Sequence, residues 1–304
     1  MSAPGIGEYG GGASAGPALA PDLAGVRADA IDRLRESGIP TPEADADLRI
    51  GHVLGFSRGQ VQAKALIAAP LDAEQRLAIA ESIERRASRE PAQHITGRAA
   101  FRTLELEVGP GVFVPRPETE QVVQHAIDAL VTVASPQPLA VDLGSGSGAI
   151  ALALAVEVPH ARVVAVENSP AAFVWTNRNV RRWGDDRVRT VFADLADALP
   201  ELDGTVDVVA SNPPYIPRDA VPRDPEVRLF DPAHALYGGE DGLDAVRAVS
   251  TTARRLLRPG GTLVLEHGEL QAEAIAALLR ADRWSAIAHH RDLLGRDRAT
   301  TALR

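Results

Sequence analysis

The sequence predicts an α/β protein in which a mostly parallel β-sheet follows a small helical domain. Residues 22–97 carry apolar side chains mainly at helical spacings of three and four. Residues 98–117 change to an alternation of apolar and polar side chains, which is typical of strands. Over residues 118–304, short apolar strands alternate with helices, and this order favours a parallel sheet covered by helices.

Residues that favour the ends of helices predict about four helices within residues 22–97. The first helix runs from Asp22 to a stop at Gly38. We expect the Thr41 side chain to cap the second helix, with Pro42 in its first position, and Asp72 to open a longer one. This part of the chain therefore predicts a small bundle.

A β-hairpin over residues 98–117, turned by Gly109, Pro110 and Gly111, is expected to join the bundle to the sheet. Five apolar runs then predict buried parallel strands, and two short runs predict a terminal hairpin. These seven strands are expected at 139–142, 163–167, 188–192, 206–211, 262–266, 284–289 and 300–303.

Composition excludes several classes of protein. The chain has 304 residues, 45% of them hydrophobic, which is enough for two domains with buried cores. A net charge of −9 speaks against a protein that coats nucleic acid. Because there is no cysteine, disulfides, thiolate metal sites and cysteine nucleophiles are excluded, and we expect a cytoplasmic protein.

Residues 1–21 form a Gly- and Ala-rich tail for which we expect disorder. The tail has no basic start and no apolar core of signal-peptide length. No apolar run in the chain approaches the ~18 to 20 residues that cross a bilayer, so we expect no insertion into a membrane.

A glycine-rich loop follows the first strand of the expected sheet and opens an apolar helix. Because glycines let the backbone turn sharply and approach a ligand, the loop predicts a nucleotide-like ligand at the helix N-terminus. The same spacing also satisfies a dinucleotide-binding fingerprint, so the loop alone leaves the ligand open. The candidate binding residues are Gly144, Ser145, Gly146, Ser147 and Gly148.

Two acidic residues end the second and third strands. Glu167 could accept hydrogen bonds from the ribose hydroxyls of a nucleoside, and Asp194 could accept from the amine of adenine. A solvated strand end for Glu167 and a turn cap for Asp194 are the alternative interpretations.

The fourth strand ends directly in Asn212-Pro213-Pro214-Tyr215, the most specific feature of the sequence. Two successive prolines stiffen the loop and leave its carbonyls free to accept. A planar amide or amine nitrogen could donate to the Asn212 oxygen and the Pro213 carbonyl while Tyr215 stacks over its plane. The alternative interpretation is a simple strand-ending turn.

Such a site suits methyl transfer from a sulfonium to a planar nitrogen. The lone pair of an amide nitrogen is delocalised, so orientation of the two reactants must supply much of the catalysis. Asn212 and Tyr215 are therefore the candidate catalytic residues, and no metal is needed.

The chain resembles the release factor glutamine methyltransferases, the PrmC or HemK family. Besides the glycine loop and Asn212–Tyr215, the similar stretches are 91–97, 114–120, 226–243 and 265–268. The resemblance implies a class I methyltransferase domain with a Rossmann-like fold that uses S-adenosylmethionine. It also implies methylation of the glutamine in the Gly-Gly-Gln motif of class I peptide-chain release factors, with the helical domain helping to grip them.

Carried over to this chain, the family's cofactor site falls on residues 144–148, Glu167 and Asn212, and its glutamine site on Asn212–Tyr215. Leu195 stands where some members have an aromatic residue near adenine. For His94 and Arg116, the alternative interpretations are a hinge histidine with satisfied hydrogen bonds and a brace of the domain interface. His267 is a candidate base, but water could take the proton of the amide, so it is assigned no catalytic role.

The main rival is a methyltransferase for the exocyclic amine of adenine or guanine, because Asn212–Tyr215 suits that nitrogen equally. It would need a basic channel, whereas the helical domain mixes acids and bases almost evenly. A non-catalytic nucleotide-binding protein and an NAD-dependent oxidoreductase would leave Asn212–Tyr215 without a purpose. We expect a monomer whose partner is the release factor, with no stable nucleic-acid binding.

Overall fold

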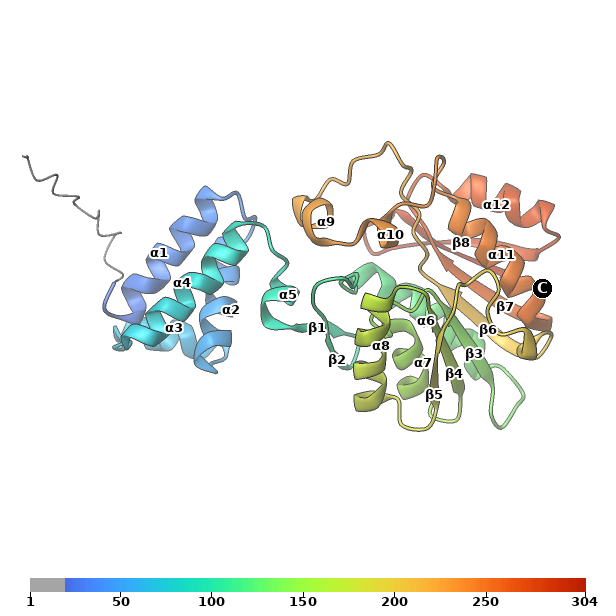
Figure 1. Cartoon of the computed structure of the whole chain (residues 1–304), viewed down its shortest axis with the longest axis horizontal. Coiled ribbons are helices and arrows are strands. Elements are labelled where there is room, and N and C mark those ends of the chain that lie inside the picture. The colour runs from blue at the N-terminus through green and yellow to red at the C-terminus, as the bar shows by residue number, and fades with distance from the viewer. Residues whose placement is uncertain (1–19) are drawn as a thin grey trace, which may run out of the picture. The chain divides into compact units, whose positions relative to one another are not determined.

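The computed structural model describes residues 20–304, which form two compact units that divide after Ser88 (Figure 1). Of the expected tail, therefore, only Ala20 and Pro21 are described, and the rest lies outside these residues. Within residues 20–304, no helix is both long and apolar enough to cross a membrane.

The first unit is a bundle of four helices with its own apolar core, centred on Leu34, Ile50 and Ile79. Asp72 opens the fourth helix through a capping box with Gln75, as expected. Thr41 precedes the second helix, but its hydroxyl bonds the Asp45 carboxylate instead of a backbone amide, so the expected cap is wrong. The helices are α1 (Leu23–Glu36), α2 (Pro42–Leu54), α3 (Arg58–Leu66) and α4 (Ala73–Ala87).

The second unit begins with α5 (Ala92–Thr96) and the antiparallel hairpin of β1 (Arg98–Phe101) and β2 (Leu104–Glu107). The hairpin turns at residues 102–103. The turn expected at Gly109–Gly111 is present as well, since the Val112 amide donates to the Gly109 carbonyl at 3.3 Å, but it follows the hairpin and does not join its strands. These glycines also allow close packing, because a Cβ on Gly109 would lie 2.5 Å from the Trp175 ring.

Seven strands form one sheet in the order β5-β4-β3-β6-β7-β9-β8. The first five in this order are parallel, and β9 and β8 close the sheet as an antiparallel hairpin, as the sequence predicted. Their bounds are β3 (Leu139–Leu143), β4 (Arg162–Glu167), β5 (Val188–Phe192), β6 (Val206–Ser211), β7 (Leu257–Glu266), β8 (Ser285–Arg291) and β9 (Asp297–Leu303).

Helices cover both faces of this sheet (Figure 1). Alternation along the strands divides the core, because Ala140 packs with α6 and α7 while its neighbour Val141 packs with α11 and α12. The helices are α6 (Pro117–Val131), α7 (Ala149–Glu157), α8 (Pro170–Trp183), α11 (Asp244–Leu256) and α12 (Ala272–Ala281), with the short helices η1 (Pro200–Leu202), α9 (Pro225–Phe230) and α10 (Ala233–Leu236) in the connections.

The strand order reverses between β3 and β6. From β3 the chain proceeds through β4 to β5, whereas β6 and β7 lie on the other side of β3. The Ser211 hydroxyl at the end of β6 donates to the Leu143 carbonyl at the end of β3 over 2.6 Å. Ligands of open parallel sheets bind beyond the carboxyl ends of the strands at such a reversal.

Candidate active site

A cavity of about 1230 Å³ lies at this reversal. Single small-molecule pockets commonly measure ~300 to 1,000 Å³, so the cavity has room for two reactants. The structure brings most of the predicted site residues together on its wall: Gly144, Ser145, Gly146, Ser147, Glu167, Asp194, Asn212, Pro214 and Tyr215. The two exceptions are Gly148 and Pro213.

The glycine loop needs glycine for its backbone conformation. Gly144, Gly146 and Gly148 all have positive φ, at 78°, 56° and 83°. A Cβ on Gly144 or Gly146 would meet nothing within 4 Å, so this side of the loop is open to a ligand. Gly148 instead occupies the N-cap position of α7.

Glu167 is buried and ties the glycine loop to the end of β4. Its Oε2 accepts from the Gly146 amide at 2.7 Å and its Oε1 from the Ser169 amide at 2.8 Å. Each carboxylate oxygen can accept a second hydrogen bond. Glu167 therefore holds the loop in place and still offers acceptors to a ribose.

Asp194 lines the cavity together with Asn168 and Leu195. Its Oδ1 accepts from the Ala196 amide at 2.9 Å, and its Oδ2 accepts from the Asn168 side chain at 3.0 Å. The residue thus caps the following turn and faces the cavity as well, so the two interpretations of Asp194 are compatible.

Asp142, just before the glycine loop, is fully buried. Its Oδ2 accepts from the Ala151 amide at 3.1 Å, while Oδ1 has no hydrogen-bond partner among the described residues. Burial raises the pKa of this carboxyl to about 7, and the nearby Glu167 contributes to the rise. Such a costly group directly behind a binding loop is typical of functional sites.

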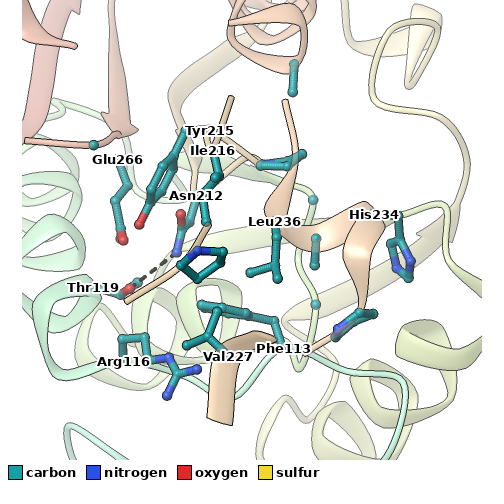
Figure 2. Close-up of a pocket in the computed structure, with 18 of the residues that line it drawn as sticks. Phe113, Arg116, Thr119, Asn212, Tyr215, Ile216, Val227, His234, Leu236 and Glu266 are labelled. Atoms are coloured by element: carbon teal, nitrogen blue, oxygen red, sulfur yellow. Dashed lines mark hydrogen bonds between the residues drawn. The ribbon is translucent and has the colours of Figure 1, made fainter. Parts of the chain in front are cut away.

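The Asn212 side chain faces the cavity, with its Nδ2 donating to the Thr119 hydroxyl at 3.3 Å (Figure 2). Tyr215 lies beside it, and burial raises the pKa of its phenol to about 12, so the phenol stays neutral. Pro213 is buried and does not line the cavity.

Two residues of this wall had no role in the sequence interpretation. Thr119, in the first turn of α6, and Glu266, at the end of β7, are 4% and 1% exposed and both line the cavity. Figure 2 shows them grouped with Asn212 and Tyr215. The signal for Glu266 was its place at the end of a parallel strand, the same rule that selected Asn212.

The wall on the other side of Asn212 is largely apolar, with Phe113, Val227 and Leu236 close to one another (Figure 2). The Arg116 guanidinium lies 4.9 Å from the centre of the Phe113 ring and pairs with the buried Asp231 at 2.5 Å. Arg116 therefore connects the segment before α6 to the one that follows α9.

The two histidines left without a role are both buried. The two ring nitrogens of His267 contact the Thr300 hydroxyl and the Gly268 carbonyl, and burial lowers the pKa of this imidazole. Burial likewise lowers the pKa of His94. Neither histidine lines the cavity.

The residues present fit S-adenosylmethionine. The open glycine loop at the start of α7 suits its polar end, the Glu167 carboxylate suits ribose hydroxyls, and Asp194 with Leu195 suits adenine. In the part of the chain that is described, no group of three or more His, Asp or Glu side chains is placed to bind a metal.

Comparison with protein-family models finds two matches. Residues 26–97 match the PrmC N-terminal domain, and residues 110–236 match the methyltransferase small domain. Among solved structures, the 16S rRNA N2 methyltransferase of T. thermophilus, determined with AdoMet and guanosine, is similar with a TM-score of 0.50. That alignment covers 68% of this chain and 49% of the other at 21% identity, which shows the shared fold.

Curated relatives align over most of their length. The release factor glutamine methyltransferase of Streptomyces coelicolor is 48% identical over 90% of this chain and 95% of the relative. That of Mycolicibacterium smegmatis is 44% identical over 89% and 94%. A 4-amino-L-phenylalanine/4-methylamino-L-phenylalanine methyltransferase of Streptomyces pristinaespiralis is also 44% identical, over 88% and 91%. The chain therefore belongs to the release factor glutamine methyltransferase family and is an S-adenosylmethionine-dependent methyltransferase.

Proposed function

We propose that this enzyme methylates the side-chain amide nitrogen of the glutamine in the Gly-Gly-Gln motif of class I peptide-chain release factors. The observation that carries the proposal is the meeting of the glycine loop and Asn212–Tyr215 on one cavity, at the ends of the neighbouring strands β3 and β6. The names of the relatives from S. coelicolor and M. smegmatis support the substrate.

The catalytic contribution of the protein is orientation. Asn212 Oδ1 accepts an N–H group of the substrate amide, Pro213 and Pro214 keep the loop stiff, and Tyr215 packs against the amide plane. S-adenosylmethionine supplies an electrophilic methyl group when bound. Holding the nitrogen in attack geometry can contribute up to ~7 to 11 kcal/mol to the lowering of the barrier.

The opposite wall holds the cofactor. Residues 144–147 and Asn212 surround its polar end, with Gly148 as the N-cap of α7, while Glu167 accepts from the ribose and Asp194 accepts from the adenine amine. The openness of the loop at Gly144 and Gly146 and the free lone pairs of Glu167 support this assignment.

The division of labour along the chain is part of the proposal. Residues 22–97 recognise the release factor, the segment 98–117 links them to the methyltransferase domain, and residues 118–304 carry out the chemistry. The separate core of the helical unit supports such a division. The enzyme acts as a cytoplasmic monomer, and its net charge of −9 disfavours stable nucleic-acid binding.

A second candidate substrate is a small aromatic amine. It is favoured by the apolar wall of Phe113, Val227 and Leu236 beside Asn212, and by the relative that acts on 4-amino-L-phenylalanine. An aniline nitrogen is also planar and carries N–H donors, so Asn212 could hold it in the same way.

Parallel reactions separate these substrates. The purified enzyme is incubated with methyl-labelled S-adenosylmethionine and, separately, unmodified release factor, 4-amino-L-phenylalanine, transfer RNA and DNA. We expect label on the release factor alone. Label only on the amine would favour the second candidate, label only on nucleic acid would overturn both, and absence of label would contradict a catalytic role.

A further inference from the structure

The Asn212 amide carries a carbonyl oxygen and an amino group on the same planar carbon. Only one of its two orientations presents the oxygen to a substrate N–H, and the other presents donors that would repel it. The proposed function, on which this inference rests, therefore requires something to fix the orientation. Thr119 and Glu266 are the described groups placed to do so.

The hydroxyl of Thr119 lies between the other two side chains. It accepts from Asn212 Nδ2 at 3.3 Å. The buried Glu266 carboxylate lies next to it in Figure 2, and its Oε2 has no hydrogen-bond partner among the described residues, so it is available to accept the Thr119 proton. The three residues come from α6, from the loop after β6 and from β7, and the chain brings them together only on folding.

The number of available protons decides which group donates in each hydrogen bond between Glu266, Thr119 and Asn212. An ionised carboxylate can only accept hydrogen bonds, so in a hydrogen bond with Glu266 it is the Thr119 hydroxyl that supplies its single proton. The Thr119 oxygen is then left only as an acceptor, and the Asn212 group that faces it must be the NH₂. Asn212 Oδ1 is consequently turned to the other side.

We infer that Thr119 and Glu266 are positioning residues that fix the Asn212 amide with its oxygen toward the substrate nitrogen. Neither contacts the reacting atoms in this account. They act through Asn212, and their effect is on the orientation of the bound amide.

The charge of Glu266 controls the direction of this chain of hydrogen bonds. Burial raises the pKa of Glu266 to about 7, Glu118 adds to the rise, and Arg298 and the Thr119 hydroxyl oppose it. Tyr215, also nearby, is neutral. A protonated Glu266 can donate to Thr119, which can then donate to Asn212 and favour the wrong amide orientation. Activity should therefore be present above pH 7 and fall as the pH drops through that value.

The test compares Thr119→Val, which removes the hydroxyl at nearly constant shape, with Thr119→Ser, which keeps it. Thr132→Val, at the exposed end of the same helix, is the matched control. We expect Thr119→Val to lower kcat for the release factor by roughly 10- to 100-fold, because one orienting hydrogen bond is lost. Thr119→Ser should recover activity to within a few fold, and the Kd for S-adenosylmethionine should not change in either variant.

Glu266→Gln provides a second arm that does not depend on how well Thr119→Val folds. A glutamine can donate as well as accept, so the direction is no longer set. We expect a lower kcat and loss of the fall in activity below pH 7. Three results would each overturn the inference. The first is a Glu266→Gln enzyme whose activity still falls below pH 7 as in the wild type. The others are a wild-type kcat in Thr119→Val and a Thr119→Ser enzyme that is as impaired as Thr119→Val. Failure of the wild-type enzyme to methylate the release factor would instead refute the proposed function.

Discussion

On the glycine-loop side of the cavity the polar contacts run mainly to backbone amides, whereas on the Asn212 side they run between side chains. Glu167 accepts from the amides of Gly146 and Ser169. Asn212 is held instead by the Thr119 side chain, next to Glu266. In the proposed function, the glycine-loop side would hold the cofactor and depends on backbone conformation, whereas the Asn212 side would hold the substrate and depends on the identity of its side chains.

The largest effect should come from Asn212→Ala. This change removes the oxygen that accepts from the substrate, so we expect kcat to fall by about 10² to 10³-fold, the scale on which single orienting donors or acceptors act. Calorimetric titration with S-adenosylmethionine should still show binding, because most of the cofactor wall is intact. Complete loss of cofactor affinity would show that Asn212 belongs chiefly to the cofactor wall.

Gly146→Val tests the backbone side. The side chain would project into the open face of the loop, and we expect the Kd for S-adenosylmethionine to rise by roughly 10- to 100-fold, the loss of one or two hydrogen bonds. Gly260→Val is the matched control, because Gly260 also has a positive φ and open space but lies outside the cavity. Equal losses of cofactor affinity in both variants would refer the effect to backbone strain.

Asp142→Asn should stabilise the fold. The folded-state pKa of about 7 lies above the ordinary value of 3.8, so wild-type Asp142 is destabilising once the pH exceeds the lower value, and fully so above pH 7. We expect a gain on the order of 2 to 4 kcal/mol at pH 8 that shrinks toward pH 5. Denaturant unfolding at pH 8 and pH 5 measures this gain in the free energy of unfolding. A gain that does not depend on pH would contradict the raised pKa of Asp142.

Arg116→Met should have the smallest effect. Asp231 would lose its ion-pair partner while remaining buried, which we expect to cost about 1 to 3 kcal/mol, reduced by the partial exposure of the arginine. Adding Asp231→Asn should restore part of the loss. A double-mutant cycle of unfolding free energies measures the coupling, and purely additive changes would mean that the pair contributes nothing.

Much of the fold could be predicted because its signals are local. The strands expected at 188–192 and 206–211 match β5 and β6. β6 is buried throughout, as predicted, whereas β5 is the edge strand and only Val188 is buried, so the predicted burial is wrong for β5. The glycine loop and Asn212–Tyr215 were predicted to meet because the carboxyl ends of parallel strands share one edge of the sheet.

What could not be predicted depends on contacts between distant segments. Gly109 serves a close approach to Trp175, which its neighbours in the sequence do not reveal. Thr119 and Glu266 were visible as parts of family-like stretches, but their relation to Asn212 follows only from the packing of α6 and β7 around β6. Thr41 shows the same limit, because Asp45 competes for its hydroxyl.

Tandem mass spectrometry of the digested release factor locates the transferred methyl group. We expect one methyl group on the side-chain nitrogen of the Gly-Gly-Gln glutamine, and none when that glutamine is replaced by glutamate, which has no amide nitrogen. A methyl group on another residue, or one that persists after the replacement, would contradict the assignment of Asn212–Tyr215 as the site that holds a glutamine amide.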